Sequence, residues 1–306
     1  MADDFVTPDP IRYFLTIWSI LAATLSFAGN TVVLVASRKF RALKVDKVSV
    51  KLIENLAVAD LGYTLVGIIP TIGALIANNW IYGRQFCVVN KVLTNIFFNM
   101  TTLLVSLLSV SKLTCLLFPI HARTRRSRHA VILVTLVWVL VTTYSVVSTA
   151  VSNPELYYDT VTFQCWVNYT NRIPFGTILV GWMLLMNVII IISTTWLLVQ
   201  VKILTLGLKK GAIAIVVISV IFTIATLPAA IIMIMKMAHV QLGEVAGPVF
   251  NIVTTYIFYI SNFFNPAVYY FTIRSFKHFV DEKVFRLSVP ETRNILTSTS
   301  PSRPTT

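Results

Sequence analysis

The sequence predicts an all-α membrane protein, a seven-transmembrane helix bundle with a short amphipathic eighth helix. The 306 residues are 56% hydrophobic and 12% charged, with a mean hydropathy of +0.79. A soluble globular chain carries about twice that share of charged residues. Seven apolar stretches are each long enough to cross a hydrocarbon core about 30 Å thick. Lys and Arg gather in alternate loops between these stretches, as in proteins that cross the bilayer repeatedly.

The apolar stretches take up more than half of the chain, which leaves no room for a separate soluble domain. They lie at roughly 11–36, 50–77, 88–117, 130–151, 174–203, 210–236 and 246–271. We expect an extracellular N-terminus over 1–10, a seven-transmembrane domain over 11–271, an amphipathic helix 8 over 272–286 and a disordered cytosolic tail over 287–306. The tail is rich in Ser, Thr and Pro and low in apolar residues, a composition typical of disorder.

The basic residues predict the orientation in the membrane. The loops near 38–51 and 123–128 and the region after 273 are rich in Lys and Arg, whereas the opposite side holds few. These few are Arg12, Arg84, Lys91, Arg172 and Lys236. The positive-inside rule therefore predicts a multi-pass plasma-membrane protein with its N-terminus outside and its C-terminus in the cytosol. This topology explains the net charge of +13 better than nucleic-acid binding does, and the basic loops suit the anionic lipids of the inner leaflet.

The outer side also holds two of the three cysteines. Cys87 and Cys165 lie where disulfides persist, whereas Cys115 lies near the inner face and is expected to be a free thiol. Asn168 begins an Asn-Tyr-Thr sequon in the same outer loop as Cys165, so we expect glycosylation there.

Several polar residues fall inside the predicted spans, where such groups are costly and commonly functional. Asp60 lies in the second stretch, Asn30 in the first, and Ser261, Asn262 and Asn265 in the seventh. They could be separate helix-packing residues. Their comparable depth in three stretches favours one shared polar cluster instead.

Sequence motifs occur in a fixed order along the stretches. They are Gly29-Asn30, Leu56-Ala57-Val58-Ala59-Asp60, Trp80-Ile81-Tyr82-Gly83 before Cys87, Trp138, Phe222 before Pro228, Asn265-Pro266-Ala267-Val268-Tyr269, and Phe276. Through these motifs nearly the whole chain resembles the rhodopsin-like (class A) G-protein-coupled receptors. Each motif alone is weak, but their combination in the right segments is highly specific.

The resemblance implies roles for individual residues. Cys87 and Cys165 would form the disulfide between the third helix and the second outer loop. Tyr269 would swing inward on activation. A sodium-binding polar network, with Asp60 as the charged ligand, would include Asn30, Asp60, Thr101, Ser261 and Asn265.

The activation motif of the third helix departs from the family pattern. The family's Asp-Arg-Tyr is Ser111-Lys112-Leu113 in this chain. Lysine keeps the charge but loses the planar fork of arginine, and the acidic partner that restrains an inactive state is missing. Lys112 is either part of an altered activation switch or a lysine that reaches the membrane interface. The first alternative predicts weakened G-protein coupling, or raised basal activity if a packing restraint is also absent.

The sixth helix departs as well. Thr226, between Phe222 and Pro228, stands where most family members carry tryptophan. Pro266 and Tyr269 of the seventh helix are retained. The family's folding elements are therefore more complete in this chain than its activation elements.

The resemblance places a ligand pocket at the outer end of the bundle. Thr94 stands where amine receptors of the family keep aspartate, and Tyr259 where opsins keep the retinal lysine. We therefore expect neither a biogenic-amine receptor nor a photopigment. The candidate pocket residues, a set without charge, are Thr94, Asn95, Phe98, Ala229, Met233, Asn251, Thr255 and Tyr259.

The second outer loop predicts a peptide as the first ligand class. Residues 155–170 alternate aromatic and β-branched residues, a pattern typical of a β-hairpin, and peptide receptors of the family often have such a hairpin. A lipid or another neutral small molecule is the next expectation. The cytosolic partners implied by the resemblance are a heterotrimeric G protein and, through a phosphorylated tail, arrestin.

Sequence features bear on three rival functions. A non-coupling scavenger or dimerisation modulator with a receptor fold would account for the degenerate Asp-Arg-Tyr motif. A transporter or channel is disfavoured because the chain lacks internal repeats. The sequence shows no nucleophile–base constellation and no metal-ligand set, so we expect that the protein is not an enzyme and needs no cofactor beyond an allosteric sodium ion.

Overall fold

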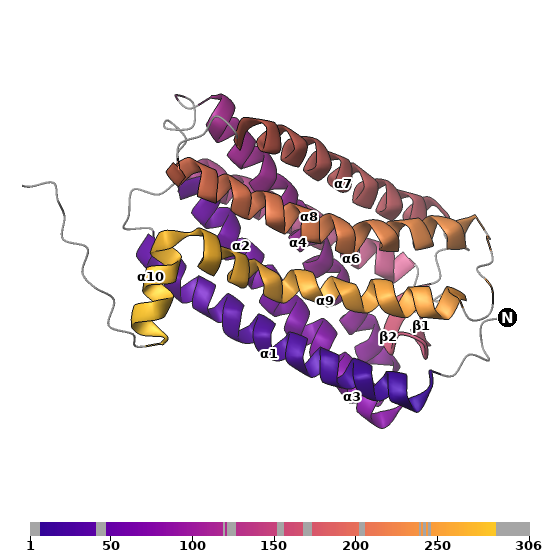
Figure 1. Cartoon of the computed structure of the whole chain (residues 1–306). Helices are drawn as coiled ribbons and strands as arrows, with labels where there is room; N and C mark the ends of the chain where they lie inside the picture. The colour runs from indigo at the N-terminus through magenta and orange to yellow at the C-terminus, as the bar shows by residue number, and fades with distance from the viewer. Residues whose placement is uncertain are drawn as a thin grey trace, which may run out of the picture.

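The apolar stretches form long helices that run side by side, with a small β-hairpin at one end of the bundle (Figure 1). The computed structural model describes residues 7–40, 47–118, 120, 127–151, 156–167, 173–201, 206–238, 240, 243 and 246–285. Its helices are α1 (Asp9–Phe40), α2 (Lys47–Tyr63), α3 (Ile69–Ala77), α4 (Gly83–Leu117), α6 (Ser127–Val151), α7 (Ile173–Val201), α8 (Leu206–Met237), α9 (Ala246–Thr272) and α10 (Arg274–Lys283). The hairpin consists of β1 (Leu156–Asp159) and β2 (Gln164–Val167). The sequon residue Asn168 and the predicted tail 287–306 lie outside the described residues.

Six of the described helical stretches are long and apolar enough to cross a membrane. They are Asp9–Arg38, Val48–Ala77, Gly83–Leu117, Arg128–Val151, Gly176–Gln200 and Gly211–Met237. The remaining long helix of the bundle, α9, has 27 residues and is not among these six stretches. It packs against α1 and α8, and its Ser261, Asn262 and Asn265 are buried there. The predicted seven-helix bundle is therefore confirmed.

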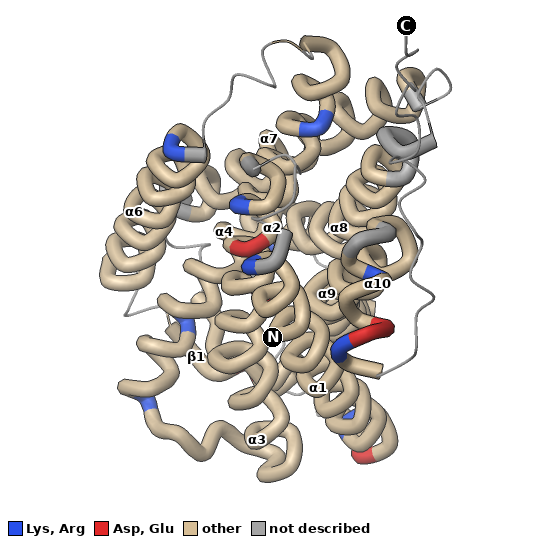
Figure 2. The backbone as a smooth tube through the Cα atoms, turned by 90° about the vertical axis from the view of Figure 1, so that its left-hand side faces the viewer, with Lys and Arg blue, Asp and Glu red and all other residues tan. Residues whose placement is uncertain are grey.

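The outside of the bundle is apolar and its interior is partly polar. Phe14, Ile76 and Leu140 are each about two-thirds exposed, as expected of side chains that face lipid. Charged positions are few along the described helices when the bundle is viewed from the α10 end (Figure 2). This reversal of the usual soluble pattern agrees with a multi-pass membrane protein.

A π-helical turn at Thr64–Ile68 joins α2 and α3 into one long span. Pro70 follows this turn, and its nitrogen has no hydrogen to donate to the Val66 carbonyl four residues earlier. The side-chain amide of Asn90 in α4 donates to that carbonyl instead. Because a carbonyl inside a membrane needs a partner within the protein, Asn90 stabilises this irregular turn.

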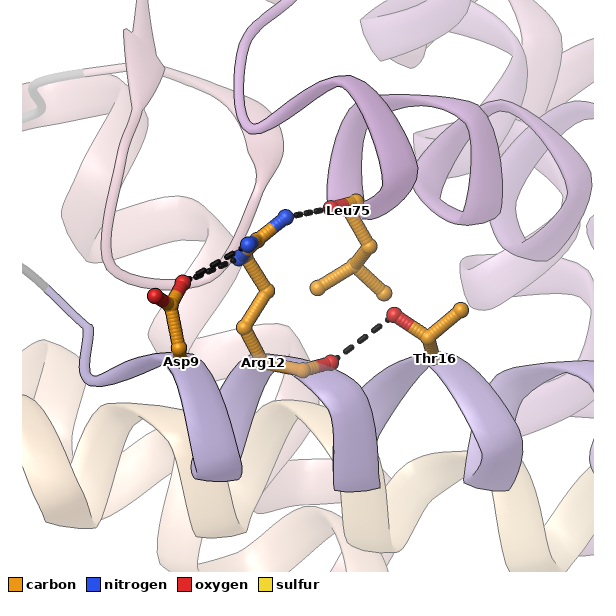
Figure 3. Close-up of polar contacts among 4 residues, drawn as sticks. All are labelled: Asp9, Arg12, Thr16 and Leu75. Carbon is orange, nitrogen blue, oxygen red and sulfur yellow. Dashed lines mark hydrogen bonds and ion pairs between the residues drawn. The ribbon is translucent and has the colours of Figure 1, made fainter.

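The N-terminal end of α1 and the C-terminal end of α3 are tied together by Arg12 (Figure 3). Its guanidinium donates to the Leu75 carbonyl at 3.0 Å, near the C-terminus of α3, where carbonyls lack intrahelical partners. The same group pairs with Asp9 at 2.6 Å, one turn earlier on α1. Arg12 thus caps α3 from a neighbouring helix.

The β-hairpin predicted within 155–170 is confirmed. Its two strands are antiparallel, with Tyr158 opposite Cys165. Cys165 forms a disulfide with Cys87 in the first turns of α4, and the two Cα atoms lie 5.6 Å apart. The disulfide therefore holds β2 against the end of α4.

At the opposite end of the bundle, α10 turns across the ends of the long helices (Figure 1). Phe276 and Val280 lie one turn apart on its buried face, against the main core. Tyr270 of α9 donates its hydroxyl to Asp281 at 2.8 Å. This helix lies within the region 272–286 that the sequence assigned to helix 8.

Candidate functional site

Asp60 lies at the centre of the polar interior. Its side chain in α2 is fully buried. Thr101 of α4 donates to Oδ1 at 3.1 Å, and the Asn265 amide of α9 donates to Oδ2 at 2.9 Å. A buried carboxylate without such donors is strongly unfavourable. Asp60 therefore joins three helices through one side chain.

Gly29 and Asn30 of α1 accommodate Pro266 of α9 in two ways. Pro266 leaves the Asn262 carbonyl, four residues earlier, without its helical donor. Asn30 Nδ2 donates to that carbonyl at 2.8 Å. At Gly29 a Cβ atom would lie 2.9 Å from Cβ and Cγ of Pro266, so the absence of a side chain allows the two helices to approach.

Asn30 is connected to Asp60 only through intermediate groups. Its amide nitrogen lies 3.2 Å from Ser26 Oγ, which lies 2.7 Å from Thr64 Oγ1. Thr64 in turn donates to the backbone carbonyl of Asp60 at 2.7 Å. A chain of contacts therefore leads from Asn30 to the Asp60 backbone.

Only some of the predicted sodium ligands present an oxygen atom near the Asp60 carboxylate. The Ser261 hydroxyl donates to the Phe258 carbonyl at 2.7 Å and does not hydrogen-bond the Asp60 carboxylate. Asn265 presents its amide nitrogen, which cannot bind a cation. The oxygens that would suit Na⁺ here are the Asp60 carboxylate and the Thr101 hydroxyl. The described residues contain no cluster of three or more His, Cys, Asp or Glu.

Phe258 of α9 contacts aromatic rings from three other helices. Its ring centroid lies 5.1 Å from that of Tyr63 in α2, 4.8 Å from Phe98 in α4 and 6.3 Å from Phe222 in α8. Such pairs contribute about 0.5–1.5 kcal/mol each beyond the area they bury. Phe98 and Phe222 were predicted site residues, whereas Phe258 and Tyr63 were not.

Thr226 forms a polar contact where the family usually carries tryptophan. Its hydroxyl donates to Asn187 Oδ1 of α7 at 3.1 Å and is also 2.9 Å from the carbonyl of Phe222. Pro228 follows two residues later inside α8. The position therefore links α8 to α7 through a hydrogen bond between side chains.

The altered motif Ser111-Lys112-Leu113 lies in the last turns of α4. Lys112 is half-buried and, among the residues the structure describes, forms no hydrogen bond or ion pair. The Ser111 hydroxyl is buried and has no hydrogen-bond partner there. Leu113 packs against the main core. The intramolecular ion pair of the family is therefore not formed by these three residues.

A different contact joins α4 to α8 close to that motif. Ser109 Oγ lies 2.8 Å from Ser219 Oγ, and both side chains are fully buried. Ser109 also donates to the Val105 carbonyl in its own helix at 3.0 Å. The sequence-based reasoning missed this pair, because serines inside apolar helices commonly bond only to their own backbone.

Tyr269 of α9 is buried next to α10. Its ring meets that of Phe276 edge-on, with centroids 6.3 Å apart. Its hydroxyl has no hydrogen-bond partner among the described residues. A rearrangement that supplied a partner would remove an unfavourable buried polar group.

Four of the predicted pocket residues lie near the hairpin. Phe98, Ala229 and Met233 pack in the apolar cluster that also contains the disulfide. Tyr259 is fully buried, and its hydroxyl accepts a hydrogen bond from Gln164 of β2 at 2.8 Å. The structure thus brings these four residues to the hairpin end of the bundle.

The other pocket candidates are more scattered. Asn95 is buried in α4, and Asn251 and Thr255 are half-buried in α9. The Thr94 methyl would lie 3.4 Å from a Cβ at Gly67, so Thr94 packs against the π-helical turn. The structure does not gather these four into one group with the hairpin.

The hairpin turn closes over α9. Val161, Thr162 and Phe163 are each at most 6% exposed. The Tyr256 hydroxyl donates to the Thr162 carbonyl at 3.0 Å, one turn before the contact of Tyr259 with the hairpin. The β1–β2 hairpin is therefore held to the bundle by α9 as well as by the disulfide.

Lys91 and Trp166 were missed as site residues. Lys91 is only 6% exposed, and its ammonium lies 4.0 Å from the centre of the Trp166 ring. A signal was available in the sequence, because Lys91 follows Cys87 by one helical turn and Trp166 follows Cys165 directly. The disulfide between these cysteines would have predicted their proximity.

Comparison with known proteins supports the receptor assignment. Residues 29–269 match the family described as "7 transmembrane receptor (rhodopsin family)". The chain is 26% identical over 184 residues to "Tachykinin-like peptides receptor 86C" of Drosophila melanogaster; the match covers 56% of this chain and 34%, about a third, of that receptor's length. The fold is similar to that of squid rhodopsin, with a TM-score of 0.75 and 19% identity over 93% of this chain and 88% of that one.

The family match covers most of the chain and contains Asp60, the Ser111-Lys112-Leu113 motif and Tyr269. Its members are receptors, so the expectation that the protein is not an enzyme is confirmed. The chain therefore belongs to the rhodopsin family of seven-transmembrane receptors, the class A G-protein-coupled receptors.

Proposed function

We propose that this receptor sits in the plasma membrane and transmits the binding of an extracellular peptide or neutral small molecule, such as a lipid, to heterotrimeric G proteins. Its N-terminus is outside and its C-terminus is in the cytosol. The observation that carries the proposal is the Asp60 carboxylate, which hydrogen-bonds both α4 and α9. An ionisable group shared by three helices can bias their packing through its charge state or a bound cation.

A peptide is the first ligand class in this proposal. The β-hairpin over the outer end of the bundle supports it, as does the similarity to a receptor named for tachykinin-like peptides. An extended peptide could add contacts along such a hairpin. The pocket candidates without charge keep the neutral small molecule as the second class.

The proposal is tested in cells that express the full chain with a panel of Gα subunits. Peptide and lipid libraries are added, and G-protein activation is recorded for wild type and for Lys112→Ala. We expect at least one ligand to activate wild type, with a changed response in the variant. A ligand that is internalised while no Gα subunit responds would favour the non-coupling scavenger.

A sodium ion held by Asp60 and Thr101 is part of the proposal. The thermal unfolding of purified receptor is compared in sodium and choline chloride for wild type and Asp60→Asn. At ten times its Kd, sodium would stabilise wild type by about 1.4 kcal/mol, and the variant would show no difference between the salts. Equal unfolding temperatures of wild type in both salts, across a wide concentration range, would contradict the sodium site.

Arrestin is the further cytosolic partner proposed, through the tail 287–306, which lies outside the described residues. Phosphorylation of its Ser and Thr residues would add negative charge and acceptor oxygens. Truncation after residue 286 is expected to abolish ligand-dependent arrestin recruitment while G-protein activation persists. Unchanged recruitment in the truncated receptor would contradict this role.

A further inference from the structure

Lys91 is a buried cation without an anionic partner. It lies in the first turns of α4, one turn after the disulfide residue Cys87, and is 6% exposed. Throughout the described part of the chain its ammonium forms no ion pair and no hydrogen bond. The ammonium lies over the face of Trp166, 4.0 Å from the ring centre. A cation–π contact recovers only part of the solvation that a buried ammonium loses.

A second lysine approaches the same ring from another helix. Lys236 lies in the last turn of α8, and its Nζ is 5.9 Å from the centre of the Trp166 ring. Lys236 likewise makes no ion pair with any residue that the structure describes. The separation between the two ammonium groups cannot exceed the sum of their distances to that ring. Two lysine side chains are therefore held near one indole, and neither forms an ion pair with a described residue.

The nearby acidic residue of the hairpin, Asp159, attracts Lys236 electrostatically but forms no ion pair with either lysine. The Asp159 carboxylate accepts hydrogen bonds from the Val161 amide at 3.1 Å and from the Thr162 hydroxyl at 2.7 Å. Each of its oxygens thus accepts one hydrogen bond within the hairpin turn, which holds the carboxylate there. Among the described residues no carboxylate lies within ion-pair distance of either lysine, so a ligand can supply the complementary charge.

The location of the two lysines suits a ligand. Gln164 and Trp166 are two residues apart on β2, so their side chains lie on the same face of the strand. Gln164 reaches Tyr259 on α9, whereas Trp166 lies against α4 and α8. This strand face therefore spans the outer end of the bundle, where the disulfide and the apolar cluster with Met233 also lie.

We propose that Lys91 and Lys236 together bind a carboxylate group of the ligand, with the Trp166 indole as the apolar surface beside it. The two oxygens of a carboxylate allow one contact with each ammonium. This inference rests on the proposed receptor function and narrows its ligand to an anionic one. The carboxylate could be the free C-terminus of a peptide or the head group of a fatty acid, and the experiment below distinguishes these sources.

The first test needs no ligand and uses the purified full chain in lipid nanodiscs. Lys91→Met removes the charge and keeps the length of the side chain, so we expect a higher unfolding temperature than in wild type. Lys277→Met is the matched control, because Lys277 also lies over an aromatic ring, 5.7 Å from Tyr270, on α10. A lower unfolding temperature of Lys91→Met would show that Lys91 serves the fold, which overturns the inference.

The second test measures the rise in unfolding temperature with named probes. Decanoate is compared with decanamide, and the tripeptide Ala-Phe-Leu with a free C-terminus is compared with its amidated form. We expect at least one acid to stabilise wild type more than its amide does. Its apparent affinity should fall about tenfold or more in Lys91→Met and Lys236→Met and remain in Lys91→Arg. Stabilisation by decanoate would identify a fatty acid as the source of the carboxylate, and stabilisation by the free tripeptide would identify a peptide C-terminus.

Equal shifts with acids and amides, no shift with either acid, or full binding by both methionine variants would overturn the carboxylate site. A neutral agonist that activates Lys91→Met as well as wild type would also overturn it while leaving the receptor function intact. Binding of an acid without activation of any Gα subunit would instead count against the proposed signalling and for the site. The carboxylate site and the proposed G-protein signalling can therefore be refuted independently of each other.

Discussion

Replacing Ser219 with alanine removes the hydroxyl that joins α8 to α4, and we expect this change to raise basal G-protein activation. Ser109 and Ser219 are both fully buried, and their oxygens lie 2.8 Å apart. The Ser109 hydroxyl keeps its bond to the Val105 carbonyl in the variant. The substitution therefore removes one bond between helices without leaving an unpaired hydroxyl on Ser109.

The magnitude follows from the strength of a single hydrogen bond. Such bonds contribute about 0.5–1.5 kcal/mol in proteins and about 0.6 kcal/mol on average between membrane helices. If activation separates α8 from α4, the bond exists only in the inactive state, and its loss shifts the equilibrium about two- to twelvefold, with threefold for the membrane average. Basal activity should rise by the same factor as long as the active fraction is small.

Basal nucleotide exchange on the coupled Gα subunit is measured at equal surface amounts of each receptor. Ser109→Ala should raise it similarly, and the double variant should add little, because both changes remove the same bond. Ser19→Ala is the matched control, since the buried Ser19 hydroxyl bonds only to the Leu15 carbonyl of its own helix, at 2.7 Å. Wild-type basal activity in Ser219→Ala, in a receptor that still responds to agonist, would refute the reasoning.

Two further substitutions test helix contacts inside the bundle. Gly29→Ala places a Cβ 2.9 Å from Pro266, so we expect a loss of about 1–3 kcal/mol in unfolding free energy, whereas Gly181→Ala, with no atom within 4 Å, should cost little. An unfolding temperature of Gly29→Ala equal to that of Gly181→Ala would contradict the close approach of α1 and α9. Thr226→Val removes the donor to Asn187 Oδ1, and we expect thermal unfolding to show a loss of about 1 kcal/mol. A variant as stable as wild type would mean that this bond does not hold α8 to α7.

The sequence predicted the parts of the molecule that depend on patterns along one chain segment. Apolar length predicted the spans, and alternating residues predicted the hairpin. The common depth of Asp60 and Asn265 favoured a shared cluster, and the structure places a hydrogen bond of 2.9 Å between their side chains. Each of these predictions depends on the spacing of residues along the chain, which can be read directly from the sequence.

The contacts that the sequence could not predict depend on the rotation of one helix against another. Ser109 and Ser219 are two serines among many in apolar helices, and spacing does not say which of them face each other. Phe258 is one of three phenylalanines close together in α9, yet only its ring was found to join α2, α4 and α8. Ser261 was expected beside the Asp60 carboxylate, but its hydroxyl bonds to its own helix instead.

The polar residues inside the spans separate into two groups once the prolines are considered. Asn90 and Asn30 donate to the carbonyls that Pro70 and Pro266 leave without helical donors, so their burial is accounted for by the backbone.

The charged residues Asp60 and Lys91 have no such explanation. Asp60 receives two hydrogen bonds from neighbouring helices, whereas Lys91, among the described residues, has the face of Trp166 but no hydrogen bond or ion pair. A buried charge that the fold itself leaves uncompensated is expected where a ligand supplies the compensation. By this comparison Lys91, which sequence reasoning treated only as a marker of the outer side, is the strongest indication of what the receptor binds.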